Sequence, residues 1–355
     1  MHRSHGEVAV AVEEQHEFYL VDVFASERYA GNQLAVFMNG HLYSSTQMQR
    51  IAREFNFSEV AFFFPRDSRD GLYRVRIFTP VEELPFAGHP TLGTAYVLLK
   101  YWLKEPRAQI TLDLPVGPIP VQAEYGPLQS PGEASPPVPD VDFREPSLLI
   151  MRQNPPQFGS VLDRKEVAKA LGLVEADLDP RYPVQIVSTG LPFVIAPLRD
   201  LEAARRAWMQ PSANEILAQK YGCRDVLIFC PETVNPGARL HVRVFVPFLQ
   251  EDPATGSGNG CLAAYLAKHD YDGLVSNGLR TESHPGCGGT HLRTFEIWAE
   301  QGVEMGRPSL LYLRASIEDG EKAGQPSAWQ PHTEAKITVE IGGQVISVGR
   351  GFLDL

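Results

Sequence analysis

A block of this sequence recurs farther along the chain, and the repeat limits the possible fold more than any other feature. Residues 75–80 (VRIFTP) match residues 242–247 (VRVFVP) at a shift of 167 positions, and residues 88–89 (GH) align with residues 256–257 (GS) at a shift of 168. A solenoid repeat is only about 20–50 residues long, so this spacing predicts two copies of one domain. Clefts between domains are common ligand sites. We therefore expect a ligand site where the two copies meet.

Length and charge exclude several classes of protein. A chain of 355 residues suggests two domains of about 100–200 residues each. Its 32 Lys and Arg against 43 Asp and Glu give a net charge of −11 at pH 7. Nucleic acid and anionic membranes need a basic face, so neither is an expected partner. No run approaches the roughly 20 apolar residues of a membrane-spanning helix, and the first residues lack the apolar stretch of a signal peptide. We expect a cytoplasmic protein.

The hydrophobic pattern mixes strands and helices. Residues 18–24, 34–38, 60–64 and 72–78 are typical of strands, whereas residues 47–55 carry apolar side chains at helical spacing. This mixture predicts the α+β class.

Two further segments, residues 92–103 and 261–267, are apolar nearly all round. A helix of this kind has to be enclosed rather than laid on a surface. We therefore expect two pseudo-symmetric domains, each a barrel-like mixed sheet wrapped around a central apolar helix. The expected parts are an N-terminal half at 17–126, completed by a strand at about 345–355, a Pro-rich linker or insertion at 127–156, and a C-terminal half at 157–344.

The two helix starts are candidate anion sites. Residues 88–91 (GHPT) would place His89 at the N-cap and Pro90 at the first helical position, and residues 256–258 (GSG) open the second helix. Unpaired backbone N–H groups and the helix dipole favour a carboxylate or phosphate there. Ordinary capping explains one such start equally well, but two symmetric copies favour a shared site. The candidate binding residues are Gly88, Thr91, Gly256, Ser257 and Gly258.

Three side chains are candidates for acid–base work. Glu59 lies between a helix and an apolar strand, where apolar walls would raise the pKa of its carboxyl group. Asp252 precedes Pro253 shortly before the second helix start, and a simple turn residue is the alternative there. His89 could bind a substrate or orient Glu59, or could only cap its helix.

Cofactor and metal signals are weak. Residues 256–260 (GSGNG) lack the third glycine of a dinucleotide-binding fingerprint, and no phosphate-binding P-loop occurs. His284, Cys287 and His291 have ligand side chains, but no fourth ligand is evident. We expect no cofactor and no metal.

Several long motifs resemble those of the PhzF family of phenazine-biosynthesis proteins, which have the diaminopimelate-epimerase-like fold. The resemblance runs from about residue 18 to the end of the chain. The sequence departs from the family pattern at Gln33, where a proline is common, and at Gly258, where an alanine is common. The matching stretches are MQRIAREFNFSE at 48–59, RIFTPVEELPFAGHPTLGTA at 76–95, EDPATGSGNGCLAAYLAKH at 251–269, QGVEMGRPSL at 301–310 and VGRGFLDL at 348–355.

This resemblance implies a homodimer that needs no cofactor and acts on a small carboxylate substrate. It implies that Glu59 is the catalytic acid and base, and that His89, Asp252 and Ser257 line the substrate pocket. The implied reaction moves a proton within a small cyclic carboxylic acid, most closely trans-2,3-dihydro-3-hydroxyanthranilate.

Two alternatives stay open from the sequence. One is an amino-acid racemase or epimerase of the same fold, which would use a cysteine from each half. Here the helix starts offer His89 and Ser257 instead, and Cys261 aligns with Gly93. The other is a catalytically silent protein that binds a small molecule. An assay of proton exchange would separate a silent protein from an enzyme.

Overall fold

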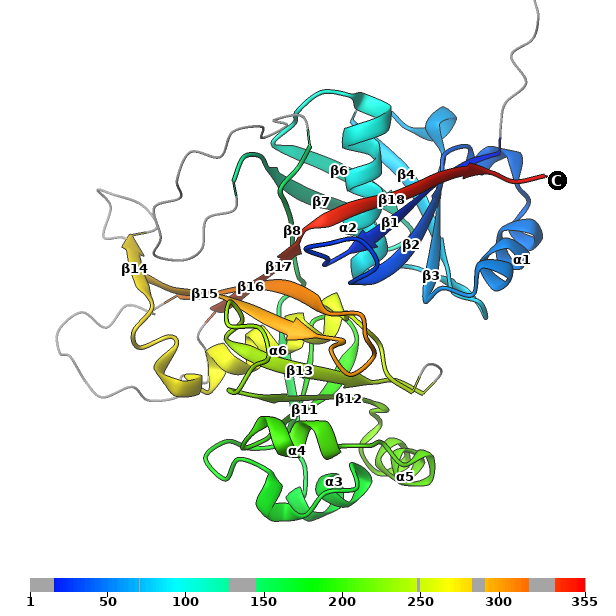
Figure 1. Ribbon diagram of the computed structural model, residues 1–355. Coiled ribbons are helices and arrows are strands. Elements are labelled where there is room, and N and C mark those ends of the chain that lie inside the picture. The colour runs from blue at the N-terminus through cyan, green and yellow to red at the C-terminus, as the bar shows by residue number, and fades with distance from the viewer. Residues whose placement is uncertain are drawn as a thin grey trace, which may run out of the picture.

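The computed structural model describes residues 16–69, 71–127, 145–247, 250–282, 291–318 and 336–354. Within these ranges, eighteen strands hydrogen-bond into one mixed sheet, and six α-helices pack against or inside it (Figure 1). The predicted α+β class is therefore confirmed. No helix of the described ranges is long and apolar enough to cross a membrane.

The strands alternate with helices in the first part of the chain and dominate the last part. The strands are β1 (Glu17–Val23), β2 (Asn32–Phe37), β3 (Glu59–Phe63), β4 (Leu72–Phe78), β5 (Glu83–Leu84), β6 (Gln109–Leu114), β7 (Gly117–Glu124), β8 (Leu148–Arg152), β9 (Gln157–Val161), β10 (Gln185–Ser188), β11 (Pro192–Pro197), β12 (Asp225–Cys230), β13 (Leu240–Phe245), β14 (Leu279–Glu282), β15 (His291–Gln301), β16 (Ser309–Glu318), β17 (Lys336–Gly343) and β18 (Val345–Phe352). The α-helices are α1 (Ser45–Phe55), α2 (Gly88–Val97), α3 (Arg164–Ala170), α4 (Leu201–Arg206), α5 (Pro211–Tyr221) and α6 (Gly256–Lys268).

The pairing order shows how the last strands tie the sheet together. From one edge, the order is β18, β1, β2, β3, β4, β6, β7, β8, β17, β16, β15, β13, β12, β11, β10 and β9, with β5 beside β4 and β14 beside β15. β17 and β18 are neighbours in the sequence, yet β17 pairs with β8 and β16 whereas β18 pairs with β1. The C-terminal strand therefore completes the part of the sheet that the N-terminal strands form.

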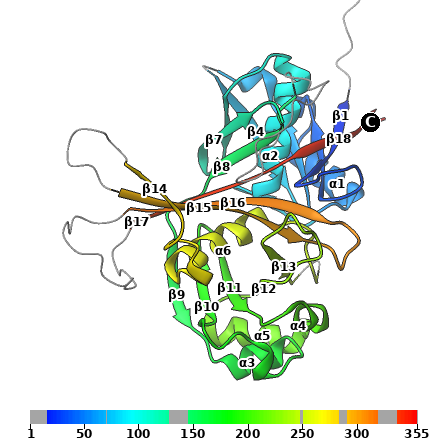
Figure 2. The same cartoon turned by 60° about the vertical axis from the view of Figure 1, so that its left-hand side comes forward.

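Two helices are enclosed by strands, as their apolar sequences predict. α2 contacts β1, β2, β3, β6, β7, β8 and β18, and every residue of it is buried. α6 contacts β10, β11, β16 and β17, and only Ser257 and Lys268 of it are not buried. Figure 2 shows α6 beneath β15 and β16, while α2 lies on the other side of these strands. The domain boundaries expected from the sequence stay a prediction.

Three expectations of local structure need correction. α2 begins at Gly88 with Ala87 as its N-cap, so His89 is not the cap. Pro90 falls in the first turn, where a missing N–H costs nothing because those donors have no partner within the helix. The α-helix expected to reach residue 103 ends at Val97 and continues as a π-helical segment.

The third correction concerns the linker expected at 127–156. Leu148–Arg152 forms β8, which pairs with β7 and β17. Its apolar side chains are buried, so the segment belongs to the sheet. Residues 128–144 lie outside the described part of the chain.

The close packing of α2 against β1 and β2 gives a first prediction. A Cβ atom at Gly93 would lie 2.5 Å from Cδ2 of Leu34 and 2.8 Å from Cγ2 of Val23. Gly93→Ala should therefore lower the free energy of unfolding by about 1–3 kcal/mol, the usual effect of overpacking a core. Chemical denaturation measures this change. Gly349→Ala is the control, because the nearest atom there is Cδ1 of Leu20 at 3.9 Å. Equal stability of the two variants would contradict the packing.

Candidate functional site

The starts of the two enclosed helices lie against each other. A Cβ atom at Gly88 would lie 3.5 Å from the Cα of Gly256 and 3.6 Å from the backbone nitrogen of Ser257. Neither helix has a side-chain cap. Both starts therefore direct their N–H groups and the positive ends of their dipoles to one region, which is the arrangement that the repeat predicts.

Two of the residues expected to bind a ligand have other contacts. Thr91 donates its hydroxyl to the carbonyl oxygen of Ala87 at 2.7 Å and its backbone N–H to the same oxygen at 3.3 Å. It therefore stabilises the first turn of α2, and its expected role in binding stays a prediction. A Cβ atom at Gly258 would lie 3.3 Å from Leu227 and Phe193. Gly258, where alanine is common in the family, therefore lies against side chains of the core.

Glu59 is placed by the end of α1. That helix stops at Asn56, which has a left-handed conformation with φ of 53°, and Glu59 then opens β3 opposite Leu34 of β2. Its Oε2 atom lies 3.5 Å from Nε2 of His89, and the Glu59 side chain is 16% exposed. Both atoms are buried and neither makes a hydrogen bond within the described residues. They are thus available to the polar groups of a substrate.

Asp252 is the third acid–base candidate, and a hydrogen-bond network holds it. One carboxylate oxygen accepts from Nδ2 of Asn32 at 3.1 Å, and the other accepts from the hydroxyl of Thr255 at 2.5 Å. The hydroxyl of Ser58, the residue before Glu59, is 3.5 Å from the first oxygen. The site thus joins residues from β2, from the start of β3 and from the turn before α6.

Burial sets the protonation of these groups. Burial and the nearby charge of Asp252 raise the pKa of Glu59 to about 8. Burial also raises the pKa of Asp252 to about 6, although its hydrogen bonds from Thr255, Asn32 and Ser58 oppose that rise. For His89, burial lowers the pKa to about 3, against the effect of a hydrogen bond with the backbone of Gln33. At neutral pH the histidine is therefore neutral and does not compensate the charge of Glu59.

This arrangement suits proton transfer. A carboxyl group with a pKa near 8 is mostly protonated at neutral pH, and its ionised form is a stronger base than an ordinary carboxylate. Strongly shifted pKa values in a group of close titratable side chains are typical of active sites. The helix starts beside this pair can bind the negative charge of a substrate.

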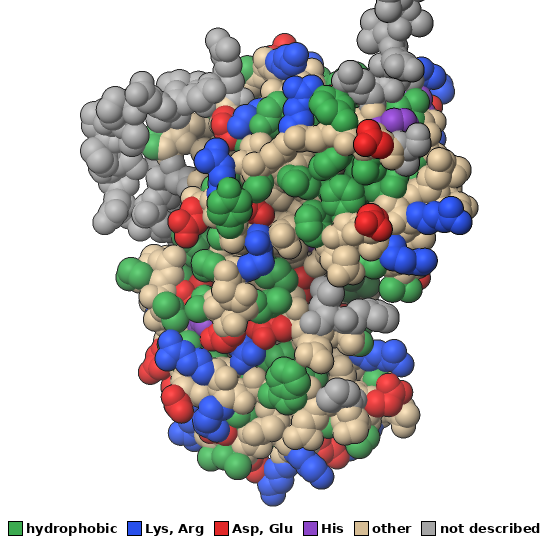
Figure 3. All heavy atoms as spheres, turned by 45° about the vertical axis from the view of Figure 1, so that its right-hand side comes forward, with side chains coloured by type: hydrophobic (Ala, Val, Ile, Leu, Met, Phe, Trp, Pro, Cys, Tyr) green, Lys and Arg blue, Asp and Glu red, His purple; other side chains and the backbone are tan. Residues whose placement is uncertain are grey.

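The electrostatic field that would attract an acidic substrate comes from the two helix starts and not from the surface of the protein. On the face shown in Figure 3, basic and acidic side chains of the described residues are interspersed. The chain as a whole carries a net charge of −11. An acidic substrate would therefore be bound by the helix starts rather than by a broadly basic surface.

Two supporting residues were not identified from the sequence as parts of the site. Asn32 donates both to Asp252 and to the carbonyl oxygen of Ala254, and Gln301 contacts the same turn from β15. Both lie in stretches that stand out in the sequence, GNQ at 31–33 and QGVEMGRPSL at 301–310. These motifs could have marked Asn32 and Gln301 as site residues. No rule of residue spacing, however, predicts that they contact the turn of Asp252.

Metal ligands and paired cysteines were the other candidates from the sequence. No group of three or more potential metal ligands occurs there. The zinc candidates His284 and Cys287 lie outside the described residues, as does the side chain of His291. Cys261 is buried with its sulfur 3.5 Å from the carbonyl oxygen of Leu191. Its counterpart Gly93 offers no second thiol.

Comparisons with known proteins agree on one family. Residues 21–327 match the model of the family described as phenazine biosynthesis-like protein. An uncharacterized isomerase of Mesorhizobium japonicum is 32% identical over 342 residues, which cover 95% of this chain and 98% of that protein. The trans-2,3-dihydro-3-hydroxyanthranilate isomerase of Pseudomonas chlororaphis is 31% identical over 346 residues, or 96% and 100% of the two chains.

A solved structure agrees as well. The Bacillus anthracis phenazine biosynthesis protein of the PhzF family superposes with a TM-score of 0.74 at 24% identity, and the match covers 96% of this chain and 100% of that one. This likeness supports the fold.

The raised pKa of Glu59 predicts a stability effect that depends on pH. A carboxyl group whose pKa is raised on folding binds its proton more tightly when folded, so ionisation destabilises the fold. The stability that the protonated carboxyl group of Glu59 contributes to the native protein should be lost as pH rises from about 4.5 to about 8. Glu59→Gln, which cannot ionise, should therefore gain melting temperature relative to the native protein across this window.

Calorimetry at pH 5 and pH 9 measures this difference. The gain in melting temperature of Glu59→Gln should be small at pH 5 and larger at pH 9. Glu54 lies on the exposed side of α1, so Glu54→Gln should differ from the native protein by the same amount at both pH values. A gain that does not grow with pH would show that Glu59 has an ordinary pKa.

Proposed function

We propose that this isomerase, which belongs to the phenazine biosynthesis-like (PhzF) protein family, moves a proton within a small cyclic carboxylic acid and needs no cofactor. The proposed substrate is trans-2,3-dihydro-3-hydroxyanthranilate or a closely related compound. The relative from Pseudomonas chlororaphis, which bears the name of that activity, supports this choice. The observation that carries the proposal is the carboxyl group of Glu59, buried beside the two helix starts with its pKa raised to about 8.

The reaction needs one group that both accepts and returns a proton. In the proposed first step, the ionised carboxylate of Glu59 takes a proton from a ring carbon, the C–H bond breaks, and its electron pair enters the conjugated system of the substrate. In the second step, that system forms a new C–H bond with the proton that Glu59 now carries. One base suffices if both carbons are on the same face of the ring and within its reach.

The other residues would hold the substrate and the developing charge. The N–H groups at Gly88 and at Ser257 would bind the substrate carboxylate, so that negative charge moving toward it is stabilised. The neutral ring of His89, 3.5 Å from Glu59, would hydrogen-bond a hydroxyl or amino group. Asp252 would accept from the other polar substituent and fix the ring for transfer.

The test is turnover of trans-2,3-dihydro-3-hydroxyanthranilate by the purified protein. Glu59→Gln should lose at least about 10³-fold in kcat, as expected for removal of a general acid–base group, while the substrate still binds. For the native protein, kcat/KM should rise with pH and level off above about pH 8, because the ionised form of Glu59 begins the reaction.

The exposed Glu54→Gln variant is the control and should keep native rates. Near-native turnover by Glu59→Gln would remove Glu59 from the mechanism. Absence of turnover by the native protein with this substrate and its close analogues would reject the proposed substrate class.

A further inference from the structure

We propose that Gln301 is a positioning residue that keeps Asp252 ionised by orienting the hydroxyl of Thr255 toward it. The inference deepens the proposed function, because it rests on Asp252 and Glu59 acting as neighbours in proton transfer. It adds a residue of β15 to the site, and no substrate contact is needed for its action.

The side chain of Gln301 is fully buried and all of its polar capacity is used. Its Nε2 donates to the carbonyl oxygen of Asp252 at 2.7 Å and to the hydroxyl oxygen of Thr255 at 3.0 Å. Its Oε1 accepts from the backbone N–H of Thr255 at 3.2 Å and from Nδ2 of Asn259 at 2.8 Å. One amide thus binds the turn that carries Asp252 and the first turn of α6.

The partners fix which way this amide points. The backbone N–H of Thr255 can only donate, so it has to meet the oxygen of Gln301, and the amide nitrogen therefore faces the Thr255 hydroxyl. Because that nitrogen only donates, it occupies a lone pair of the hydroxyl oxygen. The hydroxyl hydrogen is then directed to Asp252, whose Oδ2 atom is 2.5 Å away.

This direction favours the ionised form of Asp252. A hydrogen bond that is donated to a carboxylate stabilises its ionised form and lowers its pKa. Within the described residues, the hydroxyl of Thr255 and the amide of Asn32 counter the burial that raises the pKa of Asp252 to about 6. The titratable groups that act on Asp252 from neighbouring elements are Glu59 of β3 and Asp225 of β12, and both carry negative charge when ionised. Without the aligned hydroxyl, Asp252 would keep its proton to higher pH.

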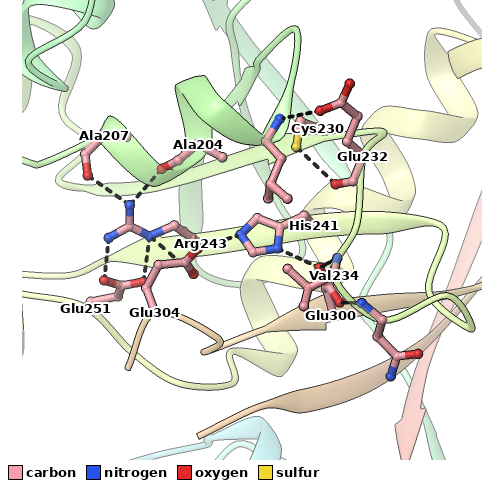
Figure 4. Close-up of polar contacts among 12 residues, drawn as sticks. Ala204, Ala207, Cys230, Glu232, Val234, His241, Arg243, Glu251, Glu300 and Glu304 are labelled. Atoms are coloured by element: carbon pink, nitrogen blue, oxygen red, sulfur yellow. Dashed lines mark hydrogen bonds and ion pairs between the residues drawn. The ribbon is translucent and has the colours of Figure 1, made fainter. Parts of the chain in front are cut away.

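The opposite face of β15 anchors Gln301. The preceding residue, Glu300, accepts from the buried ring of His241 at 2.7 Å, and Glu304 lies 3.2 Å from the other ring nitrogen (Figure 4). Burial alone would lower the pKa of His241, but its contacts with the carboxylates of Glu300 and Glu304 raise it to about 9, so the ring is a cation at neutral pH. Successive strand residues point to opposite faces. The charged contact of Glu300 thus fixes the strand where Gln301 contacts the site.

A second contact of the same cluster holds the turn itself. Arg243 binds Glu251, the residue before Asp252, through two hydrogen bonds of 2.9 and 2.7 Å. Figure 4 shows this pair beside His241 and Glu304. The turn is therefore fixed on one side by an ion pair and on the other by the Gln301 amide, which makes a stable hydroxyl direction possible.

Titration of the carboxyl groups by ¹³C NMR in the substrate-free protein tests the proposal. Aspartate and glutamate labelled at the side-chain carboxyl give the signals, and Asp252→Asn and Glu59→Gln assign them. In Gln301→Met and in Thr255→Val, the titration of Asp252 should move to higher pH by about one unit, the value of a hydrogen bond to a charged group. Thr255→Ser retains the hydroxyl and should titrate like the native protein.

Gln185→Met is the matched control for loss of a buried amide. Gln185 is buried and bonds to the carbonyl oxygen of Gly159 and to His269, not to the Asp252 turn. This variant should leave the titration of Asp252 unchanged. A native titration of Asp252 in folded Gln301→Met would overturn the proposal. If Gln301→Met does not fold, the titration of Asp252 in Thr255→Val is the test. A native titration of Asp252 in that variant would also overturn the proposal.

The two proposals fail separately in this experiment. The titration needs no substrate, so a shifted Asp252 in a protein that isomerises nothing would retain the role of Gln301 and reject the proposed function. Turnover by the native protein, together with a native titration of Asp252 in the variants, would retain the proposed function and reject the role of Gln301.

Discussion

The site depends on the burial of a carboxyl group for which the described residues supply no compensating cation. Burial and the charge of Asp252 both raise the pKa of Glu59, and neither effect is opposed by a positive side chain. The nearest basic group, His89, is itself kept neutral by burial. A surface glutamate would be a weak base at neutral pH, whereas this one has a pKa at which it can both accept and return a proton. The fold leaves the side chain of Glu59 only 16% exposed.

The two enclosed helices meet both requirements at once. Because α2 and α6 are surrounded by strands, their first turns end inside the molecule, where the dipoles act in a medium that screens them weakly. Two positive helix ends side by side repel each other unless a negative charge lies between them. The same feature would make the proposed site selective for an anion. The two starts lie close together, since a Cβ atom at Gly88 would lie 3.5 Å from the Cα of Gly256.

Much of the fold and of the candidate site could be predicted from the sequence, because the internal repeat allows one half of the chain to be compared with the other. The hydrophobic pattern pointed to the α+β class and to the two apolar helices, and the repeat pointed to the pairing of Gly88 with Gly256. The position of Glu59 before an apolar strand correctly indicated a raised pKa. These features depend on local pattern, and local pattern is what periodicity and turn residues record.

The features that were missed depend on contacts between distant parts of the chain. Asn32 and Asp252 are 220 residues apart in sequence, and no pattern of either segment specifies that they meet. The strand β8 lies next to a Pro-rich stretch, and only its pairing with β7 and β17 marks it as part of the sheet.

The central claim is that one buried carboxyl group carries the proton from one ring carbon to the other. The most direct test is isotope transfer with trans-2,3-dihydro-3-hydroxyanthranilate that is deuterated at the carbon that loses its hydrogen. Early product formed in ordinary water should retain part of the deuterium at the carbon that gains hydrogen, because the Oε2 atom of Glu59 is buried. Product that contains only solvent hydrogen from the first turnovers would contradict it.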